Sequence, residues 1–345
     1  MQAPVNTHQD EKRAVAASAL VVAGGTLVSR VLGYGREMAM YALFDRTVTD
    51  AYLAAFRLPN MFRRLLGEGS LSVAFIPVFI DLLKHGHTKR DEIPEEARKL
   101  VNGMFTVLIT ILTILTILGV AFADQVVGLI VAGQGFMSIP GKYELTVKMA
   151  RVMFCFIFLI SLYAYFMAIL NSIKKFALAA FAPTLFNVVM VASTFIPDTE
   201  APFTGFYLAL GVVIGGFFEM AILIPALIRE GFLPRPTLQI FSPHIGRVFK
   251  TMIPSWIGLG ILQLNLLVNT RLASELSEGN ISWLYLTDRI LELPLSLFAV
   301  SLSSALLPTL ARLWSQGARQ EMADTSAHYL KMVFFLAVPS AAASA

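Results

Sequence analysis

Six stretches of the chain contain no Asp, Glu, Lys or Arg, and each is close to the length of a membrane-spanning helix. A helix needs about 20 mostly apolar residues to cross the hydrocarbon core of a bilayer. The six stretches are residues 100–123, 152–173, 176–197, 201–218, 251–270 and 293–311. Because several such stretches follow one another, the pattern predicts an all-α polytopic membrane protein.

Three further apolar segments contain charged side chains and complete the predicted set of helices. They cover residues 14–44, residues 50–84 and the region from residue 321 to the last residue. The final uncharged run, 332–345, would form about 21 Å of helix, which is shorter than the bilayer core of about 30 Å. We therefore predict eight complete transmembrane helices plus a partial ninth.

The composition excludes several other classes of protein. Charged residues make up 14% of the chain, whereas soluble domains carry about 25%, and the mean hydropathy is +0.69. Too little charge is present to cover a water-facing surface, so an ordinary soluble enzyme and a disordered protein are excluded. The single cysteine, Cys155, excludes a disulfide scaffold. We expect no metal site.

The positions of the lysines and arginines predict the orientation. If the N-terminus is cytoplasmic, the cytoplasmic segments hold 15 basic residues, and the outside loops hold only Arg46 and Lys142. Cytoplasmic loops of membrane proteins carry an excess of Lys and Arg, so the N-terminus is expected in the cytoplasm. The same asymmetry accounts for the net charge of +4 without a nucleic-acid partner.

Ten basic residues lie within or near the predicted spans, and four arginines among them are the main functional signal: Arg30, Arg36, Arg63 and Arg289. An arginine at mid-bilayer costs roughly 2.5–3.5 kcal/mol on insertion scales, so such residues usually face a wet cavity or a charged partner. The planar guanidinium matches phosphate through two parallel hydrogen bonds. The pattern favours a cavity for an anionic, phosphorylated substrate. A purely structural ion-pair network is the alternative.

A short internal repeat indicates two related units. Residues 70–77 and 301–308 share five of eight positions, and both segments end in proline. Parallel repeats with a site at their interface are a recurrent transporter plan. We therefore divide the chain into a cytoplasmic tail (1–13), a first six-helix lobe (14–230) and the start of a second lobe with helices seven, eight and part of nine (231–345).

Several motifs resemble the MurJ/MviN family of lipid II flippases. They are the first-helix motif 29–37 (SRVLGYGRE), the segments 50–52 (DAY) and 56–69 (FRLPNMFRRLLGEG), the motif 181–187 (FAPTLFN), and residues 282–292, which contain Ser282, Asp288, Arg289 and Glu292. The resemblance implies a fourteen-helix, two-lobe transporter fold of the multidrug/oligosaccharidyl-lipid/polysaccharide exporter superfamily, of which this chain would carry the front portion.

The resemblance also implies roles for individual residues. Arg30, Arg36, Arg63 and Arg289 would bind the substrate, supported by Ser29, Asp50, Glu68, Asp288 and Glu292. Asp50, Asp288 and Glu292 would hold the arginines and re-pair with them when the cavity empties. No catalytic residue, metal ligand or cofactor is implied, and a membrane potential or an ion gradient would supply the driving force.

The function implied by the resemblance is transport without covalent chemistry. The protein would flip lipid II, a cell-wall precursor, from the cytoplasmic to the periplasmic leaflet of the bacterial inner membrane by alternating access. Membrane lipids and other cell-wall synthesis proteins are further expected partners. Four alternatives stay open: a flippase for another polyprenyl-linked oligosaccharide, a multidrug cation antiporter of the same superfamily, an inactive truncated fragment, and a membrane enzyme acting on polyprenyl phosphates. An enzyme would need a metal-binding acidic cluster or a positioned general base, and the acidic residues of the spans form no dense motif.

Overall fold

The computed structural model is helical throughout the part of the chain that it describes. It describes residues 7–65, 70–85, 93–196, 205–294, 306, 309–310, 313–314 and 316–344, and these contain no strand. The prediction of an all-α protein is therefore confirmed for this part. The chain divides into two compact units, Met1–Asn280 and Ile281–Ala345.

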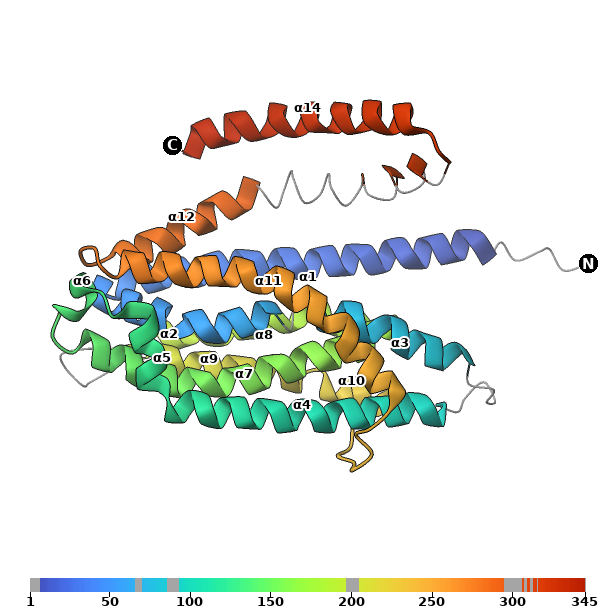
Figure 1. Cartoon of the computed structure of the whole chain (residues 1–345), viewed down its shortest axis with the longest axis horizontal. Coiled ribbons are helices and arrows are strands. Elements are labelled where there is room, and N and C mark those ends of the chain that lie inside the picture. Colours follow the sequence, from blue (N-terminus) through green and yellow to red (C-terminus); the bar gives the residue numbers. More distant parts are fainter. Residues whose placement is uncertain are drawn as a thin grey trace, which may run out of the picture. The chain divides into compact units, whose positions relative to one another are not determined.

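The first unit contains eleven of the described helices (Figure 1). They are α1 (Thr7–Leu43), α2 (Arg46–Leu65), α3 (Leu71–His85), α4 (Glu95–Ala121), α5 (Ala123–Val131), α6 (Gln134–Met137), α7 (Lys142–Ser172), α8 (Ala177–Thr194), α9 (Phe206–Ala221), α10 (Ile224–Arg229) and α11 (Pro243–Ala273).

Helix α7 forms the centre of the first unit. It packs against α2, α3, α4 and α9, while α8 packs against both α1 and α9. The aromatic side chain of Tyr165 on α7 is fully buried, and its hydroxyl donates a hydrogen bond of 2.6 Å to the carbonyl oxygen of Val101 on α4. Phe75 of α3 stacks edge-on against the same ring at 5.4 Å. The apolar faces of three helices thus meet around one residue.

Local sequence signals explain where α11 begins and why it is not straight. Ser242 caps its N-terminus by accepting a hydrogen bond of 3.3 Å from the backbone N–H of His244, and Pro243 occupies the first turn, where no backbone donor is needed. Pro254 lies inside the helix, which changes direction along its length (Figure 1). Although α11 belongs to the predicted second lobe, it packs against α2, α3 and α5.

Five of the described helices are long and apolar enough to cross a membrane: α4, α7, α8, α9 continued into α10, and α11. Each of them covers most of one of the first five uncharged stretches of the sequence. The predicted total of eight spans plus a partial ninth stays a prediction. The segment expected at 50–84 lies in two separate helices, α2 and α3, which contain Pro59 and Pro77.

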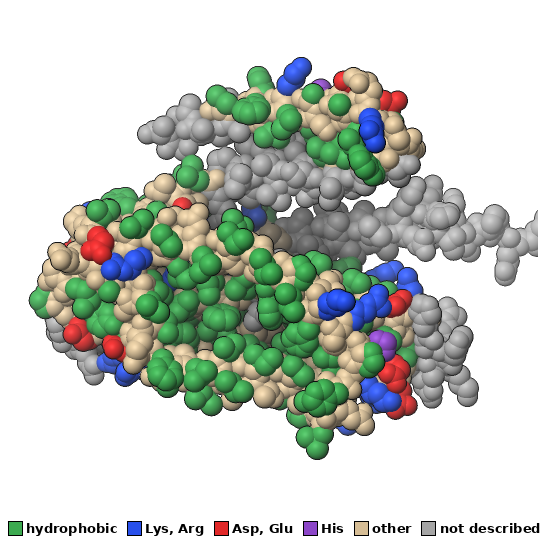
Figure 2. All heavy atoms as spheres, viewed as in Figure 1, with side chains coloured by type: hydrophobic (Ala, Val, Ile, Leu, Met, Phe, Trp, Pro, Cys, Tyr) green, Lys and Arg blue, Asp and Glu red, His purple; other side chains and the backbone are tan. Residues whose placement is uncertain are grey.

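The surface of the first unit supports a membrane location. Figure 2 shows apolar side chains over the middle of the visible face, with charged side chains gathered toward its two ends. Exposed apolar residues on α11 include Ile257, Ile261 and Leu264, and those on α4 include Ile114 and Ile117. Apolar residues exposed over whole helices are stable next to lipid chains but not next to water.

The second unit contains α12 (Asn280–Pro294, which begins at the boundary residue) and α14 (Arg319–Ser344). Most of the predicted span 293–311, and with it the second copy of the internal repeat at 301–308, lies outside the described residues. The proposed lobe boundary at residue 230 stays a prediction.

Candidate functional site

A polar cluster joins α1 to α8 within the apolar part of the first unit. The Arg36 guanidinium donates one hydrogen bond of 3.2 Å to Asn187 Oδ1 and pairs with the Glu37 carboxylate at 3.2 Å. Asn187 in turn donates from Nδ2 to the backbone oxygen of Ser29 at 2.9 Å and to its hydroxyl at 3.2 Å. The Phe186 ring lies 5.9 Å from the guanidinium carbon. The cluster therefore links two residues expected at the site, Ser29 and Arg36, through a third.

A cavity of about 320 Å³ adjoins this cluster between α1, α7 and α8. Its polar lining comes from Thr26, Ser29, Arg30 and Asn171, and its apolar lining from Met167, Phe176, Ala179, Ala180 and Pro183. The Arg30 side chain is exposed at this opening. One guanidinium, two hydroxyls and one amide on apolar walls can bind an anion that carries an apolar group.

Arg63 lies in a different set of contacts, on α2. Its Nε donates a hydrogen bond of 3.0 Å to Asn60 Oδ1, and its charge interacts with Glu219 on α9 and with Tyr163 on α7. The Glu219 carboxyl is buried. Glu219 is missing from the residues expected at the site, because the uncharged stretch 201–218 ends one residue before it. An acidic residue inside the 24-residue apolar segment Phe206–Arg229 would have been the signal.

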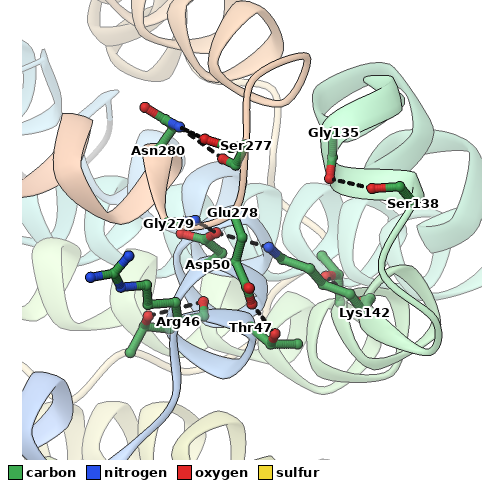
Figure 3. A network of polar contacts seen from close by, with 12 residues as sticks. Arg46, Thr47, Asp50, Gly135, Ser138, Lys142, Ser277, Glu278, Gly279 and Asn280 are labelled. Atoms are coloured by element: carbon green, nitrogen blue, oxygen red, sulfur yellow. Dashed lines mark hydrogen bonds and ion pairs between the residues drawn. The ribbon is translucent and has the colours of Figure 1, made fainter.

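A buried ion pair lies at the end of the first unit that we predict to face outward (Figure 3). Lys142 Nζ and Asp50 Oδ2 are 2.8 Å apart, and their side chains are 1% and 2% exposed. The same carboxylate oxygen accepts a hydrogen bond of 2.8 Å from the backbone N–H of Gly279. Asp50, expected to hold arginines, thus contacts a lysine. We expected that lysine in an outside loop, but it is the first residue of α7.

The loop 274–279, which joins α11 to α12, is held by this network and by contacts with neighbouring segments. Glu278 accepts a hydrogen bond from the Thr47 hydroxyl on α2. The backbone N–H of Gly133 donates to the Ser274 hydroxyl at 3.1 Å. A Cβ atom on Gly133 or on Gly135 would collide with the backbone of this loop. Small residues at these two positions therefore let the loop pack closely against the connection between α5 and α7.

Glu275 gives this loop a pH-dependent contact. The backbone N–H of Gln134 and then the Arg271 guanidinium stabilise the charged carboxylate, so its pKa lies below the ordinary value of 4.5. A group with a lowered folded-state pKa stabilises the fold above its unfolded pKa, and the contribution is lost as the pH falls through the folded value. We expect Glu275→Gln to reduce the loss of thermal stability measured between pH 6 and pH 3. An unchanged pH profile would contradict this assignment.

The remaining expected residues lie in the second unit or outside the described chain. Asp288 and Arg289 lie on α12, where Asp288 is exposed and Arg289 is half-buried. Glu292 occupies the same helix, three residues after Arg289. Glu68 lies outside the described residues. Among the residues described, no group of three His, Cys, Asp or Glu side chains could bind a metal ion.

The helix arrangement defines the class of protein. A solved structure described as lipid II flippase MurJ in an inward closed conformation matches with a TM-score of 0.73 and 25% identity, over 93% of this chain and 64% of that one. A transporter of the MOP superfamily from Pyrococcus furiosus shares the fold, with a TM-score of 0.61 and 14% identity over 95% of this chain and 70% of that one. This is a multi-pass helical membrane protein with a transporter fold.

Sequence comparison places the chain within this class. The sequence model of the lipid II flippase MurJ family matches residues 39–345. A probable lipid II flippase MurJ of Bdellovibrio bacteriovorus is 43% identical over 333 residues, 96% of this chain and 62% of that protein. The lipid II flippase MurJ of Burkholderia cenocepacia is 34% identical over 330 residues, 94% of this chain and 62% of that protein.

The chain belongs to the MurJ family, as its motifs indicated. Its relatives are named as flippases, which are transporters and not enzymes. The chain spans about 62% of the length of these two curated relatives.

Proposed function

We propose that this chain takes part in flipping lipid II from the cytoplasmic to the periplasmic leaflet, with Arg30 and its neighbours binding the pyrophosphate. The observation that carries the proposal is the cavity lined by Ser29, Arg30 and Asn171, beside the Arg36 cluster. A charged head group cannot cross hydrocarbon unaided, because burying its charges is too costly. Guanidinium, hydroxyl and amide groups would replace the water around it.

Alternating access would change the partners of these groups. In the described conformation Arg36 is bound to Glu37 and Asn187, and a phosphate entering the adjacent cavity would compete for its donors. The network of Asp50, Lys142 and Gly279 would close the outward end at the same time. Alternating access requires two conformations with different contacts. A substrate shifts the equilibrium between them only if it binds one conformation more tightly than the other.

Location, orientation and energy source complete the proposal. The protein would reside in the bacterial cytoplasmic (inner) membrane with its N-terminus in the cytoplasm, as the distribution of basic residues favours. A membrane potential or an ion gradient would drive transport, and other cell-wall synthesis proteins would act beside it. We also propose that Arg289 on α12 binds substrate, supported by Asp288 and Glu292 on the same helix.

Binding of lipid II to the purified chain tests this proposal. The chain in lipid nanodiscs is titrated with lipid II and, separately, with an undecaprenyl-pyrophosphoryl oligosaccharide that lacks the peptide, and bound species are counted by native mass spectrometry. We expect saturable binding with a preference for lipid II. Equal affinities would favour a flippase for another polyprenyl-linked oligosaccharide, and absence of binding to either lipid would contradict the assigned site.

A further inference from the structure

A second, larger cavity lies at the other end of α8 from Thr194, where the turn between α7 and α8 meets α10. Its volume is about 680 Å³, within the range typical of ligand sites. The lining is mostly apolar, with contributions from Phe176, Leu178, Ile222 and Pro225. Three basic residues and one acidic residue also line it: Lys174, Lys175, Arg229 and Glu230. We call this cavity the α8–α10 groove.

The backbone that carries the two lysines has an unusual conformation. Lys174 has a φ of 63°, and it is the one described non-glycine residue with positive φ. The N–H of Lys175 donates to the Leu170 carbonyl at 2.9 Å, which closes the end of α7. Glycine is the usual residue at such a left-handed helix end, because a side chain there is strained. A lysine at this strained position places its charge at the groove.

The charges of the α8–α10 groove are only partly neutralised. Lys175 Nζ pairs with Glu230 at 2.9 Å, whereas Lys174 and Arg229 are exposed and form no ion pair with a carboxylate of the described residues. The first turn of α8 also begins here, and helix N-termini carry a partial positive charge. The groove therefore attracts an anion between apolar walls.

We propose that the α8–α10 groove binds the phosphate head group of an anionic phospholipid, with the start of an acyl chain along its apolar wall. The turn at residues 171–177 and the segment after residue 228 lie on the side of the membrane predicted to be rich in basic residues. Basic pockets between helices at that interface suit acidic lipid head groups. The apolar lining favours a lipid over free phosphate, because an acyl chain can pack against the apolar side chains and inorganic phosphate cannot.

This site is separate from the substrate-binding proposal, although Phe176 lines both cavities. Phe176 lies between the groove and the opening that contains Arg30. An anionic lipid in the groove would therefore contact a wall of the candidate substrate cavity, but the groove itself needs no lipid II to be occupied.

The test compares lipid binding to the purified 345-residue chain and to two double variants with the same change in charge. One is Lys174→Gly/Arg229→Gln in the groove, and the control is Arg247→Gln/Lys250→Gln, at two exposed positions on α11. Native mass spectrometry measures binding of phosphatidylglycerol and of phosphatidylcholine with identical acyl chains. Each lost charge near a lipid head group should weaken binding about fivefold.

We expect the groove variant to bind phosphatidylglycerol roughly 25-fold more weakly, the control variant to bind it as the unchanged chain does, and phosphatidylcholine binding to be weak in all three. Lys174→Gly relaxes the strained turn, so the fold should be retained, and a thermal unfolding midpoint checks this. Ala226→Phe provides a second test, because it fills the groove without changing charge and should also weaken phosphatidylglycerol binding.

Three outcomes would overturn the proposal. Equal weakening in both double variants would mean general electrostatic attraction to the basic surface. Equal binding of phosphatidylglycerol and phosphatidylcholine by the unchanged chain would show that the groove does not select anionic head groups. Displacement of phosphatidylglycerol by millimolar inorganic phosphate would assign the groove to a free anion instead.

Discussion

Replacing Lys142 by methionine is expected to lower the free energy of unfolding by about 3–5 kcal/mol, because it leaves the Asp50 carboxylate buried without its cation. The pair is 2.8 Å apart and almost fully buried. Methionine has a similar length, so the change removes the charge with little change in packing. Unfolding of the purified chain in mixed micelles with increasing SDS would measure the difference.

Two further variants distinguish the effect of losing the ion pair on stability from a general effect of removing a lysine. Lys148→Met removes an exposed lysine from the same helix, where its amine lies 5.0 Å from the Phe206 ring, and should cost less than about 1 kcal/mol. Adding Asp50→Asn to Lys142→Met should recover most of the lost stability, since an amide oxygen can still accept the Gly279 N–H. A Lys142→Met variant as stable as Lys148→Met would contradict the assigned partnership.

The position of this pair gives it a consequence for transport as well as for stability. Asp50 lies on α2, Lys142 on α7 and Gly279 in the loop 274–279, so one carboxylate connects three segments far apart in the chain. Under the proposed alternating access, these contacts must separate before the outward end can open. Lys142→Met should therefore also favour outward-open conformations, which increased labelling of an engineered Gly279→Cys would detect.

The apolar helices could be predicted from the sequence, while the partners of the buried charges could not. The helices α4, α7, α8, α9 and α11 correspond to uncharged runs because a membrane span must be apolar along nearly its whole length. The boundaries were less accurate. Helix α7 begins ten residues before the uncharged run at Val152, since its first three turns contain Lys142, Lys148 and Arg151.

Counting basic residues along the chain uses only their sequence positions, so it could not show that Lys142 forms a buried ion pair. Its partner Asp50 lies 92 residues away, and no local pattern reveals that the two meet. The connection between Arg36 and Asn187, 151 residues apart, was equally invisible. By contrast, Ser29 and Arg36 lie seven residues apart on one helix, so helical periodicity alone places them on one face.

Under the proposed function, replacing Arg30 by alanine should weaken lipid II binding about 10- to 100-fold and block its delivery to the outer leaflet. Arg30 is the only arginine of the described cavity lining, and hydrogen bonds to a charged group contribute roughly 1.5–3 kcal/mol each. Arg30→Lys should recover part of the affinity, because an ammonium keeps the charge but lacks the planar pair of donors that a phosphate accepts. Native mass spectrometry of the purified variants measures binding.

The matched control is Arg151→Ala, which removes an exposed arginine from α7 at a position outside that cavity. It should leave lipid II binding unchanged, and both variants should insert into the membrane in normal amounts because neither arginine is part of the apolar core. Outer-leaflet lipid II in cells that depend on the variant protein gives the transport readout. Normal labelling with Arg30→Ala would exclude Arg30 from substrate binding, and equal losses with both alanine variants would mean that net charge, not the cavity, governs transport.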